Sequence, residues 1–436
     1  MSNIIISKTP SIQEKLELMR EDAAYDIADG EPSARGDYSG GLGAADVDLA
    51  AIGRSISNIK SKPSPPTVPK VFVSNDCSFN CAYCGCRVSK DKRRYTHKTE
   101  DIADMALATA NECGHGVFIT SAVCKNPDYT EELINDTLKV LRHKRGYDGY
   151  IHAKIMPGTD PLLIKQLGFL ADRVSINIEM PHSDGFKTLA RQKTKDNIIS
   201  PMAAVNDYIN ELNPPKGIKA YSETGRRFAP AGQTTQMMVG SMGETDRTIS
   251  VLADSLYKKF ALRRVYYSPF DASQNGGYKT PKWRGRRLYQ ADRLVKLYGM
   301  SPDEILPETS PNLDFDIDPK AGYALRNIAA FPVEVNTADY EMLLRVPGIG
   351  ITSAKKIIAA RKETRLTHDK LKYMGVSLSK SKYFITCGGR YYGGKMLDSP
   401  HLRMKLWSDE FVFANGAEQL PLFNDMILPV DYDVST

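Results

Sequence analysis

Three cysteines, Cys77, Cys81 and Cys84, lie within one short segment, and the aromatic Tyr83 directly precedes the third. Thiolates are the usual ligands of iron–sulfur clusters, and a closed [4Fe–4S] site normally takes four of them. Three ligands would leave one iron open to another molecule. The spacing therefore predicts a [4Fe–4S] cluster held by Cys77, Cys81 and Cys84, with one coordination position free.

Two other interpretations of these cysteines stay open. A zinc ion prefers four ligands, and Cys86 could supply the fourth. Zinc ribbons usually bring a second CxxC pair about 15–20 residues away, however, and the sequence has none there. The thiols could also be small buried side chains without a function. The spacing favours the cluster.

The pattern CxxxCx(aromatic)C resembles that of the radical S-adenosylmethionine (SAM) enzymes. The resemblance implies that SAM occupies the open iron through its amino and carboxylate groups. It also implies that an electron from the cluster cleaves SAM to a 5′-deoxyadenosyl radical. A flavodoxin or ferredoxin is the kind of partner that would donate this electron.

A second pattern, over residues 336–358, predicts a helix, a tight turn and another helix. Asn336 is a good N-cap for the first helix, and residues 347–350 form the turn. The pattern closely matches the helix-hairpin-helix motif of DNA repair proteins. Gly348 and Gly350 would let backbone N–H groups approach a phosphate, and the second helix adds its dipole and unpaired donors.

The hairpin predicts a nucleic-acid interface whose contacts go to the backbone and so carry no sequence preference. Charge around the turn would come from Arg345, Arg361 and Lys362 as well as from two lysines of the second helix. The alternative is a helical hairpin used only for packing. The residues expected to contact nucleic acid are Gly348, Ile349, Gly350, Thr352, Lys355 and Lys356.

Composition sets broader limits. The 436 residues leave room for two or three domains, and the net charge of +6 permits nucleic-acid binding without requiring it. Seven cysteines, three of them in one segment, suit a reducing cytosol better than a disulfide framework. The apolar run at the N-terminus is too short for a signal peptide. No segment approaches the roughly 18 consecutive apolar residues of a membrane span. We therefore expect a cytoplasmic protein without membrane contact.

The elements that must position the cysteines follow from an alternation of short apolar runs and longer amphipathic segments. This alternation predicts a parallel sheet with right-handed crossovers. Six units are too few for a standard eight-stranded barrel, so the expected fold class is α/β, a partial (β/α)6 TIM-like barrel, which is also the core of the radical SAM enzymes. The strands are expected at 71–75, 117–121, 150–155, 173–179, 235–240 and 264–268. The helices are expected at 99–112, 130–143, 160–170, 198–212, 244–260 and 286–298, with Thr99, Thr130 and Asp160 at N-cap positions.

Ligands of such barrels bind at the carboxyl ends of the strands, and the cysteine loop follows the first strand. Asn177 and Glu179 alternate on one face of the fourth strand and resemble the residues that hydrogen-bond the SAM ribose. Lys154 would pair with the methionine carboxylate. Radical SAM proteins commonly carry a glycine-rich turn after the second strand, where this chain has Ser121 and Ala122. The expected SAM-binding residues are Ser121, Ala122, Lys154, Asn177, Glu179, Gln236 and Gly240.

These polar residues could instead be ordinary solvated strand ends. The candidates for a catalytic group on the same rim are Cys86, Cys124 and Tyr266, because a thiol there could donate hydrogen and an aromatic ring could face the substrate. Each is equally compatible with a buried packing role.

The order of segments as a whole resembles the DNA modification/repair radical SAM proteins. The resemblance covers roughly residues 14–391 and runs through residues 126–130, 154–158, 175–179, 243–246, 264–268, 287–292, 331–336 and 383–387. It implies a radical SAM enzyme acting on nucleic acid, DNA rather than RNA. The alternatives are an enzyme acting on RNA and a non-catalytic nucleic-acid-binding protein whose cluster only senses redox state or supports the fold.

Five segments are expected in the chain. They are an N-terminal extension and linker at 1–66, the barrel at 67–300, a connector at 301–330, an all-α helix-hairpin-helix domain at 331–392 and a tail at 393–436.

Overall fold

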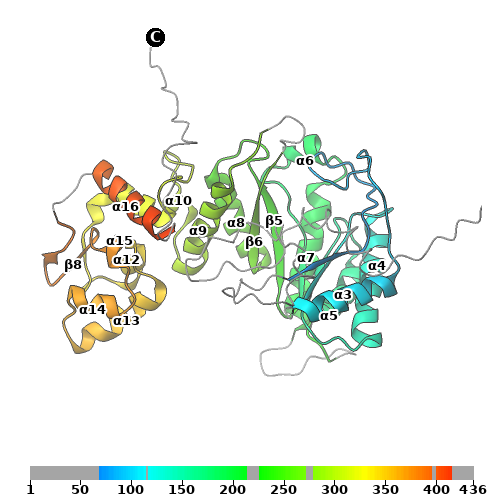
Figure 1. Ribbon diagram of the computed structural model, residues 1–436, viewed down its shortest axis with the longest axis horizontal. Coiled ribbons are helices and arrows are strands. Elements are labelled where there is room, and N and C mark those ends of the chain that lie inside the picture. Colours follow the sequence, from blue (N-terminus) through cyan, green and yellow to red (C-terminus); the bar gives the residue numbers. More distant parts are fainter. Residues whose placement is uncertain (1–67, 114–115, 214–224, 272–277, 395–398, 415–436) are drawn as a thin grey trace, which may run out of the picture. The chain divides into compact units, whose positions relative to one another are not determined.

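The computed structural model describes residues 68–113, 116–213, 225–271, 278–394 and 399–414 (Figure 1). The helix expected over residues 11–27 and the linker at 61–66 lie outside the described residues. The chain divides into two compact units, residues 1–323 and 324–436. The division falls inside the connector expected at 301–330.

The first unit is built on one six-stranded sheet, and this confirms the expected partial barrel. The strands follow one another in the order β1-β2-β3-β4-β5-β6, every neighbouring pair is parallel, and β1 and β6 form the two edges. The strands are β1 (Lys70–Phe72), β2 (Val117–Thr120), β3 (Ile151–Lys154), β4 (Arg173–Ser175), β5 (Gln233–Val239) and β6 (Arg264–Pro269).

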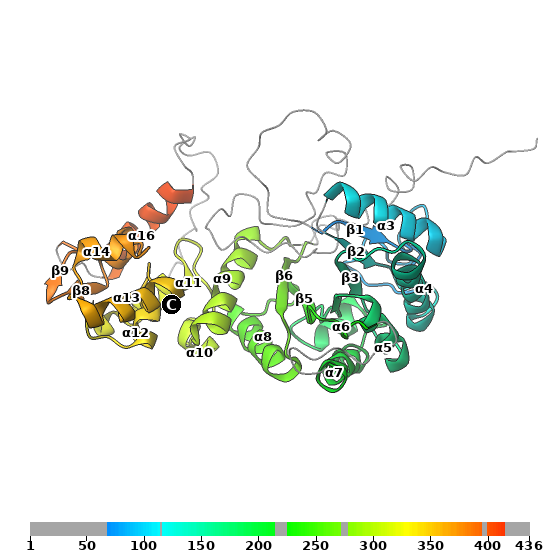
Figure 2. The same ribbon diagram turned by 90° about the horizontal axis from the view of Figure 1, so that it is seen from below.

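Helices follow the strands in turn and lie along the outer face of the curved sheet (Figure 2). They are α3 (Thr99–Cys113), α4 (Pro127–Lys139) with the π-helical turn η3 (Val140–Lys144), α5 (Pro161–Leu170), α7 (Lys195–Leu212), α8 (Asp246–Phe260) and α9 (Lys282–Tyr298). Two short helices, α6 (Asp184–Leu189) and α10 (Pro302–Ile305), were not expected. Among the residues that the structure describes, no helix is long and apolar enough to cross a membrane.

The N-cap predictions had mixed outcomes. Asp160 caps α5, because its carboxylate accepts from the backbone N–H of Leu162 at 2.7 Å. Thr130 was expected to cap the preceding helix, α4, and this was wrong. Asn126 caps α4 four residues earlier, while the Thr130 hydroxyl is buried and donates to the carbonyl of Cys124.

Strand β4 ends at Ser175, four residues before the expected end at 179. The hydroxyl of Thr235 on β5 takes the place of ladder bonds here, since it donates to the carbonyl of Ile176 at 2.7 Å and accepts from the N–H of Ile178 at 2.9 Å. Glu179 then adopts a left-handed backbone with φ of 64°. Asn177 and Glu179 therefore do not alternate along a regular strand as predicted.

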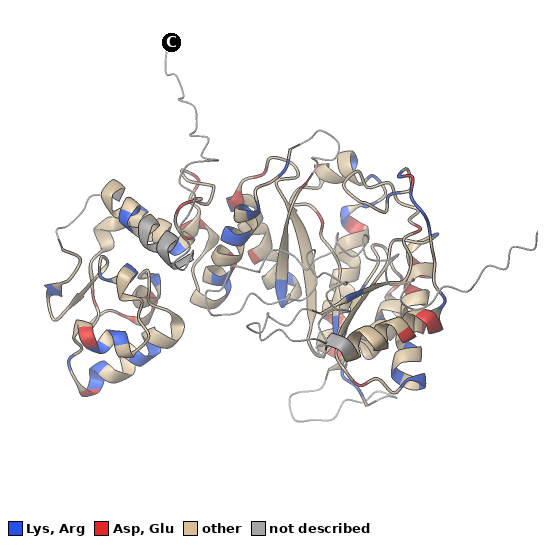
Figure 3. Cartoon of the chain, in the orientation of Figure 1, with Lys and Arg blue, Asp and Glu red and all other residues tan. Residues whose placement is uncertain are grey.

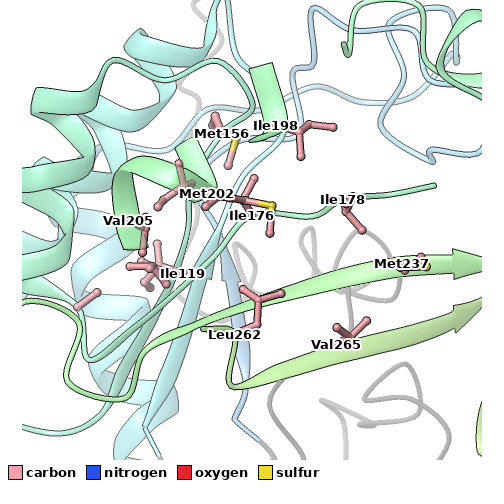
Figure 4. Close-up of a cluster of buried hydrophobic side chains, with 14 of the residues drawn as sticks. Ile119, Met156, Ile176, Ile178, Ile198, Met202, Val205, Met237, Leu262 and Val265 are labelled. Carbon is pink, nitrogen blue, oxygen red and sulfur yellow. The ribbon is translucent and has the colours of Figure 1, made fainter. Parts of the chain in front are cut away.

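Apolar side chains fill the inside of this unit. Strands buried on both faces read as continuous apolar runs in parallel sheets, and β2 has no exposed residue. Side chains from the strands meet those of α7, including Ile198, Met202 and Val205 (Figure 4). This core fixes the strand ends that carry the candidate site.

The second unit is mainly helical. Its helices include α12 (Tyr340–Arg345), α13 (Ile351–Glu363), α14 (His368–Tyr373), α15 (Leu378–Ser381) and α16 (Ser399–Ala414), and α11 (Pro319–Arg326) spans the division between the units. A small sheet of β7 (Val333–Glu334), β8 (Ile385–Cys387) and β9 (Arg390–Tyr391) adds to them, so this part is not purely α-helical as expected.

Candidate cluster site and nucleic-acid interface

The cysteine loop begins at the carboxyl end of β1. Pairing with β2 continues past the strand, because the N–H of Val73 donates to the carbonyl of Thr120 at 2.9 Å. The loop then contacts the segment after β2, where the N–H and the hydroxyl of Ser78 both donate to the carbonyl of Val123, at 2.7 and 3.0 Å. The three cysteines thus lie at the barrel rim, where the sequence analysis placed them.

Arg94 organises the return of the loop, and the sequence analysis did not single it out. Its guanidinium donates to the carbonyls of Asn75, Cys86, Arg87 and Lys90 at 2.6–2.9 Å. The fixed fork of a guanidinium suits such a converging set of acceptors. The two ends of the loop are thereby held together.

Asn75 completes this closure with its side chain. Its amide donates to the carbonyl of Arg93 at 2.9 Å and accepts from the N–H of Tyr95 at 2.8 Å. Asn75 is only 1% exposed, so these bonds form away from water.

The three thiols lie in different electrostatic surroundings. Cys77 and Cys81 are 8% and 4% exposed, and burial raises the pKa of both thiols, that of Cys81 to about 11. A hydrogen bond from the Cys86 side chain lowers the pKa of Cys84 to about 6. Backbone N–H groups also point at sulfur: Phe79 donates to Cys77 at 3.4 Å and Cys86 to Cys84 at 3.3 Å.

This donor set fits a [4Fe–4S] cluster. Three thiols from one buried loop are the soft ligands that iron–sulfur clusters take, and N–H groups directed at sulfur tune such sites. Within the described ranges, no three His, Cys, Asp or Glu side chains are arranged to hold a single metal ion. The ligands of a cluster bind different irons and so stand farther apart than the ligands of one ion.

A buried ion pair lies against the cysteine loop. Lys193, in the turn between α6 and α7, donates from Nζ to Oε1 of Glu179 at 2.6 Å and to the hydroxyl of Tyr83 at 3.4 Å. The side chains of Lys193 and Glu179 are 13% and 7% exposed. The structure therefore links Glu179 to the cysteine loop through Lys193. The sequence gives no signal for Lys193, because its partners are remote in the chain.

The segment after β2 is engaged within the protein. The N–H of Ala122 donates to the carbonyl of Ser74 at 2.9 Å, and the hydroxyl of Ser121 donates to the carbonyl of Ala122 at 2.7 Å. Both residues are buried, at 8% and 7% exposure. They lie at the rim beside the cysteine loop, and both the N–H of Ala122 and the hydroxyl of Ser121 are hydrogen-bonded within the protein.

Gly240 follows β5 with a φ of 84°, and a Cβ there would come within 2.1 Å of the Thr280 hydroxyl. Its N–H donates to the carboxylate of Glu244, which also accepts from the N–H of Met242 at 2.9 Å. The geometry gives Gly240 a part in forming this turn.

The remaining candidates differ in position, and Gln236, expected at the end of the fifth strand, lies in the middle of β5, as Tyr266 does in β6. Lys154 ends β3 and is half-buried, Asn177 follows β4, and Gln236 is buried in β5. Cys124 is buried with its sulfur 3.8 Å from the hydroxyl of Thr96. Tyr266 is buried in β6, and the Arg264 guanidinium lies 5.4 Å from the centre of its ring.

In the second unit, α12 and α13 form the expected hairpin, but the predicted cap was wrong. Asp339 caps α12, since its carboxylate accepts from the N–H of Met342 at 2.6 Å. Asn336 instead links two segments: its side chain accepts from the N–H of Leu366 at 2.8 Å and donates to the carbonyl of the same residue at 3.2 Å.

The two glycines of the hairpin turn differ. A Cβ on Gly348 would lie 2.5 Å from the carbonyl oxygen of Ser377, whose N–H donates to the carbonyl of Gly348 at 2.9 Å. Gly348 is therefore needed for packing against this segment, which the sequence analysis did not foresee. Gly350 is the N-cap residue of α13 and has no side chain to satisfy the first N–H groups of the helix.

Positive charge gathers in the part of this unit that contains the hairpin. Residues 324–394 hold 12 Lys or Arg and 5 Asp or Glu, a net charge of +7. Lysines and arginines lie along α13 and α14 (Figure 3). Thr352, Lys355 and Lys356 are exposed in the first turns of α13, whereas Ile349 is 1% exposed and belongs to the core of the hairpin.

Arg361 adds its charge from a position fixed by hydrogen bonds within the fold. Its guanidinium donates to the carbonyls of Val335 and Ala338, at 3.2 and 2.5 Å.

A parallel six-stranded partial barrel with a three-cysteine loop at its rim is the architecture of a radical SAM domain, a class of domain that takes a [4Fe–4S] cluster and SAM. Residues 71–256 match the family model of the radical SAM superfamily. Residues 329–367 match the model of the helix-hairpin-helix motif. The chain therefore contains a radical SAM domain and a helix-hairpin-helix motif.

Two solved structures illustrate its similarity to known proteins. The FeFe-hydrogenase maturase HydG from Carboxydothermus hydrogenoformans is 18% identical, with a TM-score of 0.40, over 53% of this chain and 52% of that chain. The radical S-adenosylmethionine methyltransferase TsrM from Kitasatospora setae is 12% identical, with a TM-score of 0.32, over 46% of this chain and 36% of that chain. The chain thus covers about half of HydG and about a third of TsrM. No curated protein matches it in sequence.

Proposed function

We propose that this radical SAM enzyme acts on nucleic acid and modifies or repairs DNA in preference to RNA. The observation that carries the proposal is the helix-hairpin-helix motif in the same chain as the radical SAM domain. The N-terminus of α13 offers unpaired N–H groups behind Gly350, and Lys355 and Lys356 are exposed one turn further on. Helix N-termini and lysines are the groups that bind phosphate backbones.

In this proposal Cys77, Cys81 and Cys84 ligate the cluster, which when bound supplies the electron that cleaves SAM to a 5′-deoxyadenosyl radical. Glu179 and Asn177 hold the SAM ribose, and the other predicted rim residues, Ser121, Ala122, Lys154, Gln236 and Gly240, line the rest of the SAM site. Cys86, Cys124 and Tyr266 stay candidates for a group that meets the substrate.

The hairpin unit would hold the phosphate backbone while the barrel acts on one nucleotide. In a duplex that nucleotide must be flipped out or already unpaired, because its atoms are otherwise stacked. A flavodoxin or ferredoxin would supply the electron, and the cytosol is the compartment that suits reduced thiols. Backbone contacts by themselves do not separate DNA from RNA, so RNA is the second candidate substrate.

Binding to DNA and RNA across a salt titration tests the proposal. Gly350 has an extended backbone, with φ of −95° and ψ of 173°, which valine also adopts. Gly350→Val should therefore keep the fold while its side chain blocks the approach of a phosphate, weakening binding to all sequences. Changing Lys355 and Lys356 to Ala should reduce the salt slope by up to roughly two units, since each phosphate contact in B-DNA contributes about 0.9.

The matched control removes two exposed lysines of the barrel unit, Lys139 and Lys144, and should leave the salt slope unchanged. If the Gly350 and Lys355/Lys356 variants bind DNA and RNA like the parent at every salt concentration, the hairpin serves only for packing and the proposal loses its main support.

A further inference from the structure

Lys193 is fixed against the cysteine loop by several independent contacts. The N–H of Ala82, within the loop, donates to the carbonyl of Leu189 at 2.7 Å, and the N–H of Asn80 donates to the side chain of Gln192 at 3.3 Å. The backbone on either side of Cys81 is thus attached to the segment that leads into Lys193. The Lys193 ammonium in turn reaches Tyr83, which lies between Cys81 and Cys84.

Lys193 keeps its positive charge in this position. Burial by itself would lower the pKa of the ammonium group, but Glu179 and Tyr83 raise it well above its usual range. Its Nζ lies 3.4 Å from the hydroxyl of Tyr83, the residue directly before Cys84, so the charge stands beside the cysteine loop. Glu179, its partner at 2.6 Å and 7% exposed, places a buried negative charge beside it.

We infer that Lys193 and Glu179 set the reduction potential of the cluster, with the ammonium group stabilising its reduced form and the carboxylate opposing this. Reduction adds one electron from a low-potential one-electron donor; no bond forms or breaks and no proton moves. The cluster becomes more negative by one charge. A fixed cation favours that change and a fixed anion disfavours it, and the interaction is stronger in a buried site than in water.

The inference concerns the cluster alone and does not depend on nucleic acid. A simpler interpretation is that the ion pair only anchors the loop. The two interpretations predict different shifts of the reduction potential. If the pair is only an anchor, removing either partner should have the same effect. If the charges tune the cluster, removing Lys193 and removing Glu179 should shift the potential in opposite directions.

Redox titration of the reconstituted full chain without SAM, followed by the electron paramagnetic resonance signal of the reduced cluster, separates them. Lys193→Met should lower the equilibrium constant for reduction about tenfold, a shift of about 59 mV to more negative potential for one electron. Glu179→Gln should shift the potential in the positive direction. Lys193→Arg keeps the charge and should stay close to the parent.

The matched control is Lys187→Met on α6, a lysine whose side chain is 80% exposed and pairs with Asp184 at 2.8 Å. It should leave the potential unchanged. Iron content is measured in every sample, so that loss of the cluster is not read as a shift.

If Lys193→Met does not retain iron, Glu179→Gln and Lys193→Arg decide the question. A potential in Glu179→Gln equal to that of the parent, or shifted to the negative side, would overturn the inference. So would an unchanged potential in an iron-loaded Lys193→Met.

Discussion

At the residue scale, the cysteines of the motif differ from their neighbour Cys86 in what they are expected to bind. Cys86 is 4% exposed and its side chain hydrogen-bonds to Cys84, so it lies close to a predicted ligand, but we do not expect it to ligate the cluster. The residue types and spacing of Cys77, Cys81 and Cys84 suffice to predict a cluster, because the ligands are adjacent in sequence.

Single substitutions at these positions test the ligand assignment. We expect the cluster to be lost in each of three variants, Cys77→Ala, Cys81→Ala and Cys84→Ala, because a site with only three protein ligands needs all of them. Cys86→Ala should keep four irons per chain. The measurement is iron and sulfide content after anaerobic reconstitution. Four irons in any of the first three variants, or none in Cys86→Ala, would contradict the assignment.

Other site residues could not be predicted from the sequence. Lys193 meets Tyr83 across 110 positions of chain, and no local pattern marks such a contact. The residue at which β4 ends could not be predicted either, because it depends on the side chain of Thr235 from a different strand. Both features arise from tertiary contacts, whereas the strand order and the cysteine loop follow from local patterns.

At the scale of elements, the cysteine loop depends on Arg94. Arg94→Ala removes five hydrogen bonds to loop carbonyls, each contributing up to about 0.5–1.5 kcal/mol net. We expect the loop to lose its fixed form and the iron content to fall by at least half. Arg94→Lys should be intermediate, because an ammonium group lacks the planar fork.

Arg93→Ala is the control, since its side chain is exposed and only its backbone carbonyl accepts a bond from Asn75. It should keep the parent's iron content. Full iron content in Arg94→Ala would show that the loop closes without the guanidinium.

The carboxylate of Glu334 connects the strands of the small sheet, because it accepts hydrogen bonds from the N–H groups of Gly388 and Gly389. Partial burial raises the pKa of this carboxyl, but N–H groups of Gly389, Gly388 and Asn336 and the Asn336 amide outweigh it and bring the pKa to about 2. The folded pKa lies below the value of about 4.5 in an unfolded chain. The stabilisation is therefore present above pH 4.5 and is lost as the pH falls towards 2.

Glu334→Gln should weaken local stability around residues 385–391 by on the order of 1 kcal/mol at pH 7, because the group is half-exposed and partly screened. The difference from the parent should shrink as the pH is lowered from 7 to 3. Amide hydrogen exchange in the full chain measures it at each pH. Glu341→Gln, an exposed carboxyl of the same unit, is the control. A difference that is constant with pH would contradict the role of the charge.

At the scale of the whole molecule, the chain combines a radical SAM domain with a helix-hairpin-helix motif, and residues 324–394, which contain this motif, carry a net charge of +7. Both parts were predictable, because each is a compact pattern of neighbouring residues. Gly348 shows the limit of such prediction: its position in the motif suggested phosphate binding, while the structure gives it a packing contact with Ser377.

The reaction itself tests the central claim most directly. The reconstituted protein is incubated without oxygen with SAM, reductant and either DNA or RNA, and the digested nucleosides are analysed by mass spectrometry together with 5′-deoxyadenosine. We predict a new or repaired nucleoside from DNA with the parent, less of it with Gly350→Val, and none with Cys81→Ala. SAM cleavage that leaves every nucleoside of both nucleic acids unchanged would contradict the account.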